Sequence, residues 1–225
     1  MSKKLQFQGE NSQSMGPKLA ITSWYLLCVA AAVWLTFFAP TASAQGGSPG
    51  RQVALLTCVV IYVARAAYTL FVFVKRKVPW WEAAWGGGII GFVLFFFLLG
   101  GLRVAQPIGP VDLAGMLLYF AGSYIGTASE HSRFVWKARP ENQGRLYTEG
   151  LFRYSRHINY FGDLLLFGGC AVLTRQLWTG IVPLAMALNF ILVIIPAHDA
   201  YLAVRYRSEF DHYARRTSKL IPLLY

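Results

Sequence analysis

The chain has 225 residues, of which 56% are hydrophobic, 16% aromatic and only 14% charged. This composition is too apolar and too poor in charge for an ordinary soluble domain, so it favours a protein embedded in lipid. The net charge of +11 would suit nucleic acid, but the basic residues lie between apolar runs rather than on one face, so we expect no nucleic acid partner.

The chain begins with a polar segment and continues with apolar runs long enough to cross a bilayer. A hydrocarbon core of about 30 Å requires roughly 20 apolar residues in a helix. We expect residues 1–17 to form a disordered cytoplasmic tail and residues 18–225 to form one membrane domain. The predicted spans are Leu19–Ala39, Val53–Val74, Trp81–Gly101, Val111–Glu130, Ile158–Thr174 and Leu177–Ala197. The sequence thus predicts an all-α, polytopic membrane helix bundle of about six helices with a cytoplasmic C-terminal segment.

Two interpretations remain open for the first run. The segment from Pro40 to Gly50 is rich in glycine and proline, which predicts a turn between two spans. However, Lys18 before the run and Ala42-Ser43-Ala44 after it resemble the flanks of a signal peptide, although the run is longer than the apolar part of a usual signal. Cleavage after Ala44 is therefore the alternative to a first membrane span.

The basic residues alternate between the loops, which predicts the orientation of the bundle. Lysines precede the first span, Lys75-Arg76-Lys77 follow the second, and arginines fill the fourth loop and the tail. The other three loops together hold only Arg51, Arg103 and Arg175. Both termini are therefore expected in the cytoplasm, with the protein in the endoplasmic reticulum membrane or, in a prokaryote, in the inner membrane.

Cysteine positions argue against a disulfide framework and against a metal site. Cys28, Cys58 and Cys170 are far apart in apolar stretches, and the sequence has no C-x-x-C motif and no Cys/His cluster. Zinc sites and disulfide-rich domains show closely spaced ligands or cysteines instead. We expect neither feature here.

The loop from Glu130 to Arg156 is longer than the topology requires and leads into the fifth predicted span. Asn159 and Asp163 lie one helical turn apart at the start of that span, on one face. A carboxylate at that depth is costly unless it is paired or solvated, so these two residues predict that something polar is bound. Arg153 and Arg156 either only set the topology or, beside free backbone donors at a helix N-terminus, bind an anion such as phosphate.

Two stretches resemble a known superfamily. Arg156-His157-Ile158-Asn159-Tyr160-Phe161-Gly162-Asp163 is similar to the Arg-His-Pro-Asn-Tyr-x-Gly-Asp/Glu signature of membrane sterol and steroid reductases, which isoprenylcysteine methyltransferases share. The closing stretch from Tyr201 to Pro222 resembles the C-terminal pattern of the same superfamily. The resemblance is good over residues 130–225 and looser in the second span. It implies a membrane enzyme that binds NADPH or, in the methyltransferase branch, S-adenosylmethionine.

Several details of the resemblance favour the reductase branch. Asp163 gives the signature its reductase ending, and Asn159 and Glu130 stand where reductases contact the cofactor. His198-Asp199 stands where the methyltransferases tend to carry two glutamates. Arg205 has the alternative role of a juxtamembrane charge. The resemblance implies cofactor contacts by Glu130, Lys137, Arg145, Tyr154, Arg156, His157, Asn159, Asp163, Asp199, Arg205 and Tyr206.

Tyr62 and Arg65, on one face of the second span, resemble the tyrosine-arginine helix of steroid reductases. We predict that the Tyr62 hydroxyl delivers the proton, the alternative being a core aromatic residue with a satisfied hydroxyl. Steroid 5-alpha reductases also carry a glutamate before this helix, but no acidic residue occurs between Glu10 and Glu82. Glu82 is therefore the second candidate acid, and a 3-oxo-steroid substrate does not follow.

These residues together predict hydride transfer from NADPH to an activated carbon–carbon double bond in a lipid or sterol taken from the bilayer. Two alternatives remain. One is an S-adenosylmethionine-dependent methyltransferase of an isoprenyl or phospholipid group. The other is a non-catalytic relative that keeps the superfamily pocket.

Overall fold

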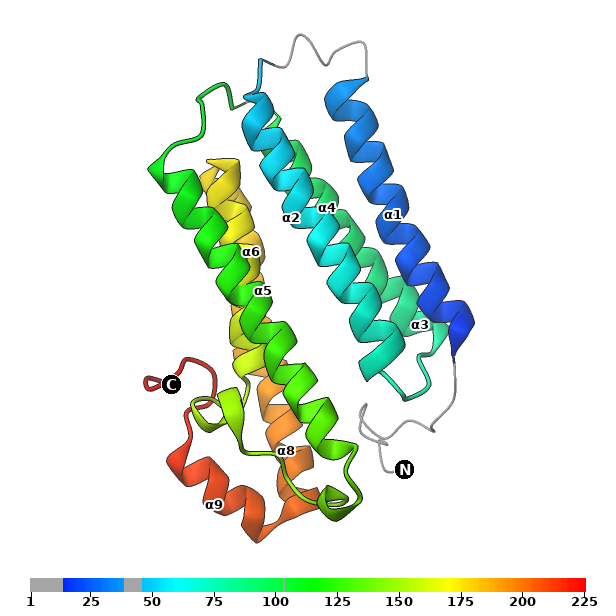
Figure 1. Cartoon of the computed structure of the whole chain (residues 1–225), viewed down its shortest axis with the longest axis vertical. Coiled ribbons are helices and arrows are strands. Elements are labelled where there is room, and N and C mark those ends of the chain that lie inside the picture. The colour runs from blue at the N-terminus through cyan, green and yellow to red at the C-terminus, as the bar shows by residue number, and fades with distance from the viewer. Residues whose placement is uncertain (1–13, 39–45, 103) are drawn as a thin grey trace. The chain divides into compact units, whose positions relative to one another are not determined.

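The computed structural model describes residues 14–38, 46–102 and 104–225, and within these ranges every regular element is a helix (Figure 1). The all-α prediction is therefore confirmed. The chain forms two compact units, the first of Met1–Met116 with Gly169–Gly180 and the second of Leu117–Gly168 with Ile181–Tyr225. The expectation of one membrane domain over residues 18–225 stays a prediction.

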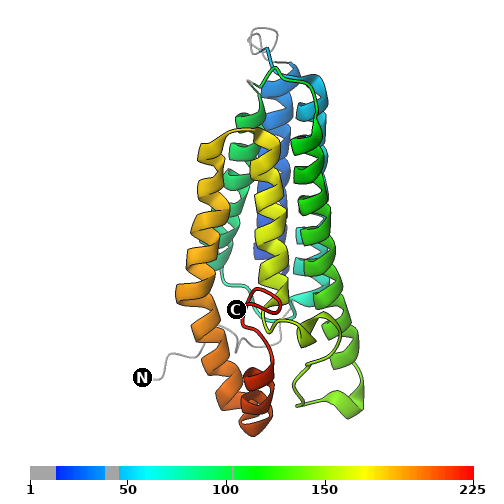
Figure 2. The same ribbon diagram turned by 90° about the vertical axis from the view of Figure 1, so that its left-hand side faces the viewer.

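The first unit is a bundle in which α1, α2 and α4 pack side by side (Figures 1 and 2). Its core includes Leu55 and Val59 of α2 and Leu94 and Phe97 of α4, all at most 2% exposed. The start of α5 and the end of α6 also belong to this unit. Its elements are α1 (Met15–Phe37), α2 (Pro49–Tyr68), the π-helical turn η2 (Thr69–Phe73), α3 (Trp80–Glu82), the π-helical η3 (Ala83–Gly87), α4 (Gly88–Gly101) and the 3₁₀ turn η6 (Leu177–Gly180).

Two helices begin earlier than expected. Helix α1 starts at Met15 rather than Leu19, so the described end of the predicted tail is helical, and residues 1–13 lie outside the described residues. Helix α2 starts at Pro49, inside the expected turn. Proline is tolerated in both first turns because the N–H groups there have no intrahelical partner. The Ala42-Ser43-Ala44 segment lies outside the described residues, so cleavage there stays an open alternative.

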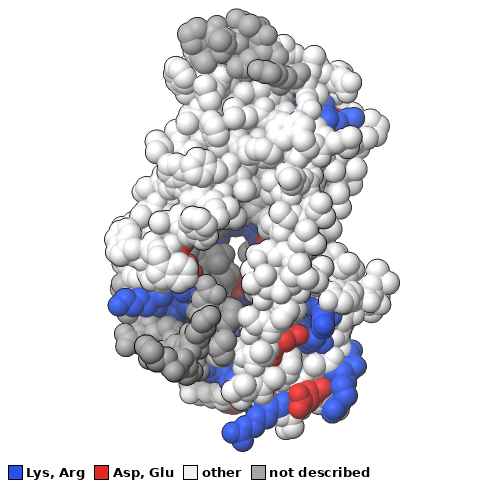
Figure 3. Space-filling model, turned by 180° about the vertical axis from the view of Figure 1, so that it is seen from behind, with Lys and Arg blue, Asp and Glu red and all other residues white. Residues whose placement is uncertain are grey.

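Within the described ranges, four helices are long and apolar enough to cross a membrane: Met15–Phe37, Pro49–Phe73, Trp80–Gly101 and Leu177–Tyr206. Helix α6 (Ile158–Thr174) has the predicted bounds but only 17 residues. Helix α5 (Pro110–Lys137) is long, but its last turns carry charged residues. It ends seven residues beyond Glu130, where the predicted span ends. Uncharged residues cover most of the surface seen in Figure 3, as a lipid environment requires. These features indicate a membrane protein.

The second unit contains the rest of α5, the first part of α6 and the C-terminal helices. Helices α5 and α6 approach closely at glycines, because a Cβ atom at Gly122 would lie only 2.4 Å from the carbonyl oxygen of Gly162. Small residues allow such backbone contact between membrane helices. The other elements are the 3₁₀ turns η4 (Pro140–Asn142) and η5 (Gly150–Arg153), α7 (Ile181–Asn189), the π-helical η7 (Phe190–Ile194), α8 (Ile195–Tyr206) and α9 (Ser208–Arg216).

The C-terminal segment returns to the start of α6 (Figure 2). The backbone N–H of Arg156 donates to the carbonyl of Ser218 at 2.9 Å, and that of His157 donates to the carbonyl of Lys219 at 3.1 Å. The buried Ser155 hydroxyl donates to the carbonyl of Leu220 at 2.8 Å. The residues that precede α6 are thus held by main-chain bonds, which fixes the side chains of Arg156 and His157 in place.

Candidate functional site

A cavity of about 200 Å³ lies within the second unit. Its walls come from the last turns of α5, from the segment that leads to α6, and from α8 and α9. Three of its side chains are cationic, and no acidic side chain is among the described residues that line it. The lining residues are Arg133, Lys137, Leu146, Tyr147, Phe152, Arg156, His198, Tyr201, Leu202, Tyr206 and Tyr213.

Hydrogen bonds tie the wall between α5 and α6 to α9. The Leu146 N–H donates to Oε1 of Glu209 at 3.1 Å, and the Tyr213 hydroxyl donates to the carbonyl of Phe152 at 2.6 Å. Burial raises the pKa of Tyr213, so its hydroxyl keeps the proton that it donates. Tyr147 packs against Phe152, with ring centroids 5.6 Å apart. This wall is therefore a packed structure in spite of its lack of long helices.

Arg156, His157 and Asp199 form a charged cluster at the start of α6. Nη2 of Arg156 lies 3.0 Å from Oδ2 of Asp199, and Nε2 of His157 lies 2.9 Å from Oδ1. Nη1 of Arg156 donates to the carbonyls of Ala214 and Thr217, both at 2.8 Å. Arg156 is 8% exposed and His157 1% exposed. One guanidinium group thus joins α6 to α8 and to the end of α9.

Two nitrogens of this cluster have no hydrogen-bond partner among the described residues, although both are buried. They are Nε of Arg156 and Nδ1 of His157. About 90% or more of buried polar groups are hydrogen-bonded to protein or to ordered water in folded proteins, so these two neighbouring nitrogens are expected to bond to water or to a ligand where the described residues supply no partner. Arg156 also lines the cavity. The cluster can therefore bind a further acceptor group.

Stacked rings hold the His157 side chain in one orientation. Its imidazole lies parallel to the Tyr160 ring, with an interplanar angle of 1° and centroids 5.4 Å apart. Tyr160 in turn stacks on Phe190 at 4.8 Å. Because the ring cannot turn freely between these neighbours and Asp199, its Nδ1 atom has a fixed direction.

Protein cations lie over two of the four tyrosine rings that line the cavity. Lys137 donates to the Tyr206 hydroxyl at 3.0 Å and lies 5.1 Å from the centre of that ring. It also donates to the carbonyl of Arg145. Arg205 donates to the Tyr201 hydroxyl at 2.6 Å and lies over the Tyr201 and Tyr206 rings. These cation–π contacts stabilise the wall and occupy the rings of Tyr201 and Tyr206.

The predicted cofactor residues fall into groups. Lys137, Arg156 and Tyr206 line the cavity, and His157 and Asp199 form the cluster with Arg156. Arg205 is exposed but braces the tyrosines. Glu130 pairs with the lining residue Arg133, and its Oε1 is buried with no partner in the described part of the chain.

The remaining predicted residues lie away from the lining. Asn159 and Asp163 are half-buried, one turn apart on α6 as expected. The Arg145 side chain is exposed, and Tyr154 is 41% exposed, with its hydroxyl accepting from Arg153 at 2.6 Å.

The two predicted acids belong to the first unit. Tyr62 is a half-buried residue of α2 whose ring centroid lies 6.5 Å from that of Tyr25. Glu82, at the end of α3, forms an ion pair with Arg76, and the two side chains are 26% and 29% exposed, respectively. The side-chain hydrogen bond from Arg76 to Glu82 raises the pKa of that guanidinium. Tyr62 thus lies near another aromatic ring, whereas Glu82 is paired with a cation. This difference bears on which of the two is the better proton donor.

Sequence reasoning missed eight of the described residues that line the cavity. Three of them are apolar, and the five with a polar group are Arg133, Tyr147, His198, Tyr201 and Tyr213. Arg133 was counted only as a topology charge, although it lies four residues before Lys137 and hence on the same helical face. Tyr201 lies four residues before Arg205, so the same spacing would have found it.

Comparison with protein families finds one family that matches the part of the chain containing the cavity. Residues 88–217 match the family described as "Protein of unknown function (DUF1295)", and this range contains all the lining residues of the cavity. No curated protein matches the chain. The family is part of the steroid 5-alpha reductase-like group. This membership agrees with the resemblance of residues 156–163 to the signature of that superfamily, but it does not identify a single enzyme. Since the match covers more than half of the chain, the protein belongs to the DUF1295 family.

Proposed function

We propose that this protein is an NADPH-dependent reductase of a carbon–carbon double bond in a membrane lipid or sterol. The observation that carries the proposal is the cavity of the second unit, with its three cationic side chains and the buried, unsatisfied Nε of Arg156. Arginine and lysine bind phosphate oxygens through charge-assisted hydrogen bonds. NADPH carries three phosphate groups, so its charge complements this lining. Membership in the steroid 5-alpha reductase-like group supports the same class of reaction.

The charge of the cavity argues against the methyltransferase alternative. S-adenosylmethionine has a sulfonium and an ammonium group against one carboxylate. Glu130 and Asp199 offset the charges of Arg133 and Arg156, but the bonds of Lys137 go to a carbonyl and a hydroxyl, so the positive charge that remains on the lining disfavours this cation. An aromatic face could bind a sulfonium, but two of the four lining tyrosines, Tyr201 and Tyr206, already carry Arg205 and Lys137. The volume of about 200 Å³ is below the roughly 300–1,000 Å³ of complete small-molecule sites, so this cavity would hold the phosphate-bearing part of the dinucleotide.

Each residue of the cavity has a role that follows from its contacts. Arg133, Lys137 and Arg156 would bind phosphate, while Asp199 keeps Arg156 and His157 in position. When bound, NADPH supplies the hydride. We assign delivery of the proton to Tyr62, because a phenol keeps its proton at neutral pH whereas Glu82 is held in an ion pair with Arg76.

Titration of the purified full-length protein with NADPH and with S-adenosylmethionine tests the cofactor. We expect NADPH to bind and Lys137→Gln to weaken it by about tenfold or more, because a charge-assisted hydrogen bond contributes about 1.5–3 kcal/mol. Lys219→Gln is the matched control, since Lys219 is exposed and does not line the cavity. Binding of S-adenosylmethionine alone would establish the methyltransferase, and binding of neither nucleotide would favour the non-catalytic relative.

Turnover of sterols and enones with NADPH tests the proton donor. Tyr62→Phe keeps the ring and should lower turnover by about 10²–10⁴-fold, with NADPH affinity unchanged within a few-fold. Glu82→Gln is the competing variant. A normal rate in Tyr62→Phe together with an inactive Glu82→Gln variant would transfer the role to Glu82.

We also propose the complete topology of six spans, in which α5 and α6 cross the membrane with the four longer apolar helices. The alternation of basic loops supports cytoplasmic termini, in the endoplasmic reticulum or the inner membrane. Cysteines introduced at Gly46 and Gln106 should then react with an impermeant maleimide only from the non-cytoplasmic side. The native cysteines are buried and should give little background. Labelling of residue 46 from the cytoplasm, or cleavage after Ala44, would contradict this topology.

A further inference from the structure

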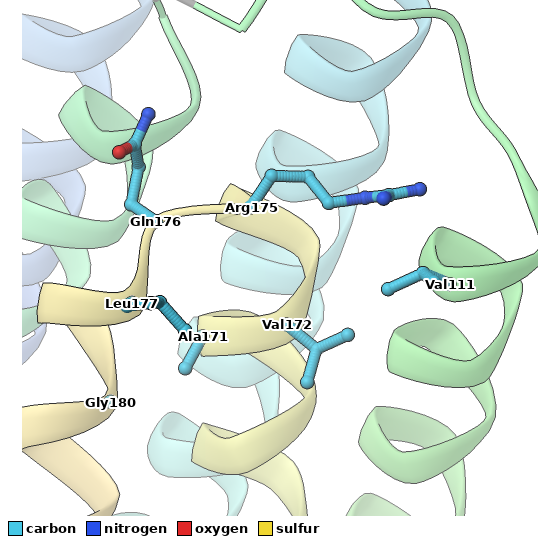
Figure 4. A pocket seen from close by; sticks show the side chains of 7 residues that line it. All are labelled: Val111, Ala171, Val172, Arg175, Gln176, Leu177 and Gly180. Atoms are coloured by element: carbon cyan, nitrogen blue, oxygen red, sulfur yellow. The ribbon is translucent and has the colours of Figure 1, made fainter.

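The first unit has an apolar groove of about 310 Å³ where α6 ends and η6 begins (Figure 4). Its apolar walls are Val111 from the first turn of α5, Ala171 and Val172 from the last turns of α6, and Leu177 and Gly180 from η6. Leu177 is fully exposed. A volume of this size is at the lower end of the range of about 300–1,000 Å³ for small-molecule sites. The groove can therefore accept an apolar chain.

Arg175 is a cationic side chain on the rim of this groove and extends from the end of α6 toward α5 (Figure 4). Its Nε and Nη2 atoms donate to the two carboxylate oxygens of Asp112, at 3.1 and 2.8 Å. Its Nη1 atom has no hydrogen-bond partner among the described residues, and the side chain is 25% exposed. Arg175 thus has donors left for a ligand.

Asp112 cannot balance this charge alone, because it also pairs with Arg51. Both side chains are 0% exposed, and Nη2 of Arg51 lies 3.2 Å from the carboxylate. The Gly109 N–H adds a further bond to Asp112 at 2.8 Å. Two guanidinium groups therefore share one saturated carboxylate, and of these two only Arg175 is exposed, so the excess positive charge is accessible there. An unbalanced cation beside apolar walls favours an anionic ligand.

We propose that this groove binds an anionic lipid, with the hydrocarbon chain along the apolar walls and the oxyanion of the head on Nη1 of Arg175. A phosphodiester lipid and a fatty acid share this chemistry. The helices that form the groove belong to a unit with three apolar helices of membrane-spanning length. The surrounding bilayer would therefore supply such ligands. The groove shares no lining residue with the cavity of the second unit, and the inference does not depend on the reductase function.

Gly180→Leu tests the groove without disturbing the ion pairs. A Cβ atom at Gly180 meets no atom within 4 Å, so the leucine side chain extends into open space. Gly86→Leu is the matched control, because Gly86 also has open space around its Cβ position and does not line the groove. Native mass spectrometry of the detergent-solubilised full chain would measure the binding of dioleoylphosphatidylglycerol, oleate and the neutral lipid diolein.

We expect Gly180→Leu to weaken dioleoylphosphatidylglycerol and oleate by about tenfold or more, since even small changes in an apolar pocket have effects of that size. Gly86→Leu should bind like the wild type. Arg175→Gln should weaken both anions but not diolein. Tighter binding of phosphatidylglycerol identifies a phosphodiester ligand, and tighter binding of oleate identifies a fatty acid. Equal affinities in Gly180→Leu and Gly86→Leu, or no discrimination against diolein by the wild type, would overturn the proposal.

Discussion

Asp112 of the first unit and Asp199 of the second each lie between two basic side chains, yet their surroundings differ. Asp112 is 0% exposed and its partner Arg51 has all its N–H groups bonded to Asp112 or to main-chain carbonyls. Asp199 is 18% exposed, and its partners Arg156 and His157 each keep one buried nitrogen unsatisfied in the described structure. The buried Arg51–Asp112 pair is saturated and fixes helices, whereas Arg156, His157 and the partly exposed Arg175 keep nitrogens that can bond to a ligand.

Asp112→Asn should have the largest effect on stability. The amide keeps the shape of the side chain but leaves Arg51 as a buried charge without its counter-ion, which costs about 3–5 kcal/mol. Unfolding of the detergent-solubilised protein, followed by helical circular dichroism, would measure the loss. Asp211→Asn is the matched control, because Asp211 is an exposed residue of α9. If both variants unfold alike, the first cluster does not hold the helices together.

Asp199→Asn should have a smaller effect on stability and a distinct effect on binding. The carboxylate is partly exposed and receives one bond from each partner, so the expected loss is about 1–3 kcal/mol. NADPH affinity should also fall, because Arg156 and His157 lose the group that orients them. Asp112→Asn, by contrast, should leave nucleotide affinity within a few-fold wherever the variant is folded. Calorimetric titration of both variants distinguishes the two clusters, and equal affinities would argue against this division of roles.

The close helix contacts of the two units should also respond differently. A Cβ atom at Gly122 would lie 2.4 Å from the carbonyl oxygen of Gly162, a main-chain atom that cannot move alone. A Cβ atom at Gly101 would meet the end of the Leu55 side chain at 2.2 Å, and that side chain can change its rotamer. We expect Gly122→Ala to lower the free energy of unfolding by about 1–3 kcal/mol and Gly101→Ala to lower it by less. Thermal unfolding of the two variants measures this, and a reversed order would contradict the proposed rigidity of the α5–α6 contact.

The sequence predicted the helices well where an apolar run coincides with the whole helix. The bounds of α6 agree with the run Ile158–Thr174 because basic residues bracket it on both sides. The prediction failed at α5, whose helix continues from Glu130 to Lys137. Hydropathy detects the part of a helix that suits lipid, and an amphipathic continuation has no such signal.

The candidate site was predicted in part through the resemblance, which included Lys137, Arg156 and Tyr206 of the cavity. The cluster around Asp112 was not predicted at all, because Arg51 and Arg175 were counted only as loop charges. These residues are 61 and 63 positions from Asp112 in the chain, and their pairing depends on how the helices pack. Periodicity describes one element at a time, so it cannot show such long-range partners.

Tyr213→Phe should have the smallest effect, about 1 kcal/mol, because it removes one hydrogen bond to the carbonyl of Phe152 and keeps the packing of the ring. Burial raises the pKa of Tyr213 above its ordinary value of about 10. The folded state therefore keeps the proton while the unfolded chain releases it, and this contribution to stability declines as the pH rises above about 10. The difference in free energy of unfolding between the wild type and Tyr213→Phe should thus be largest near pH 8 and become smaller as the pH rises above about 10. Other ionisable groups are common to both proteins and cancel in the difference. A gap that stays constant over this range would mean that the Tyr213 hydroxyl does not hold the wall between α5 and α6.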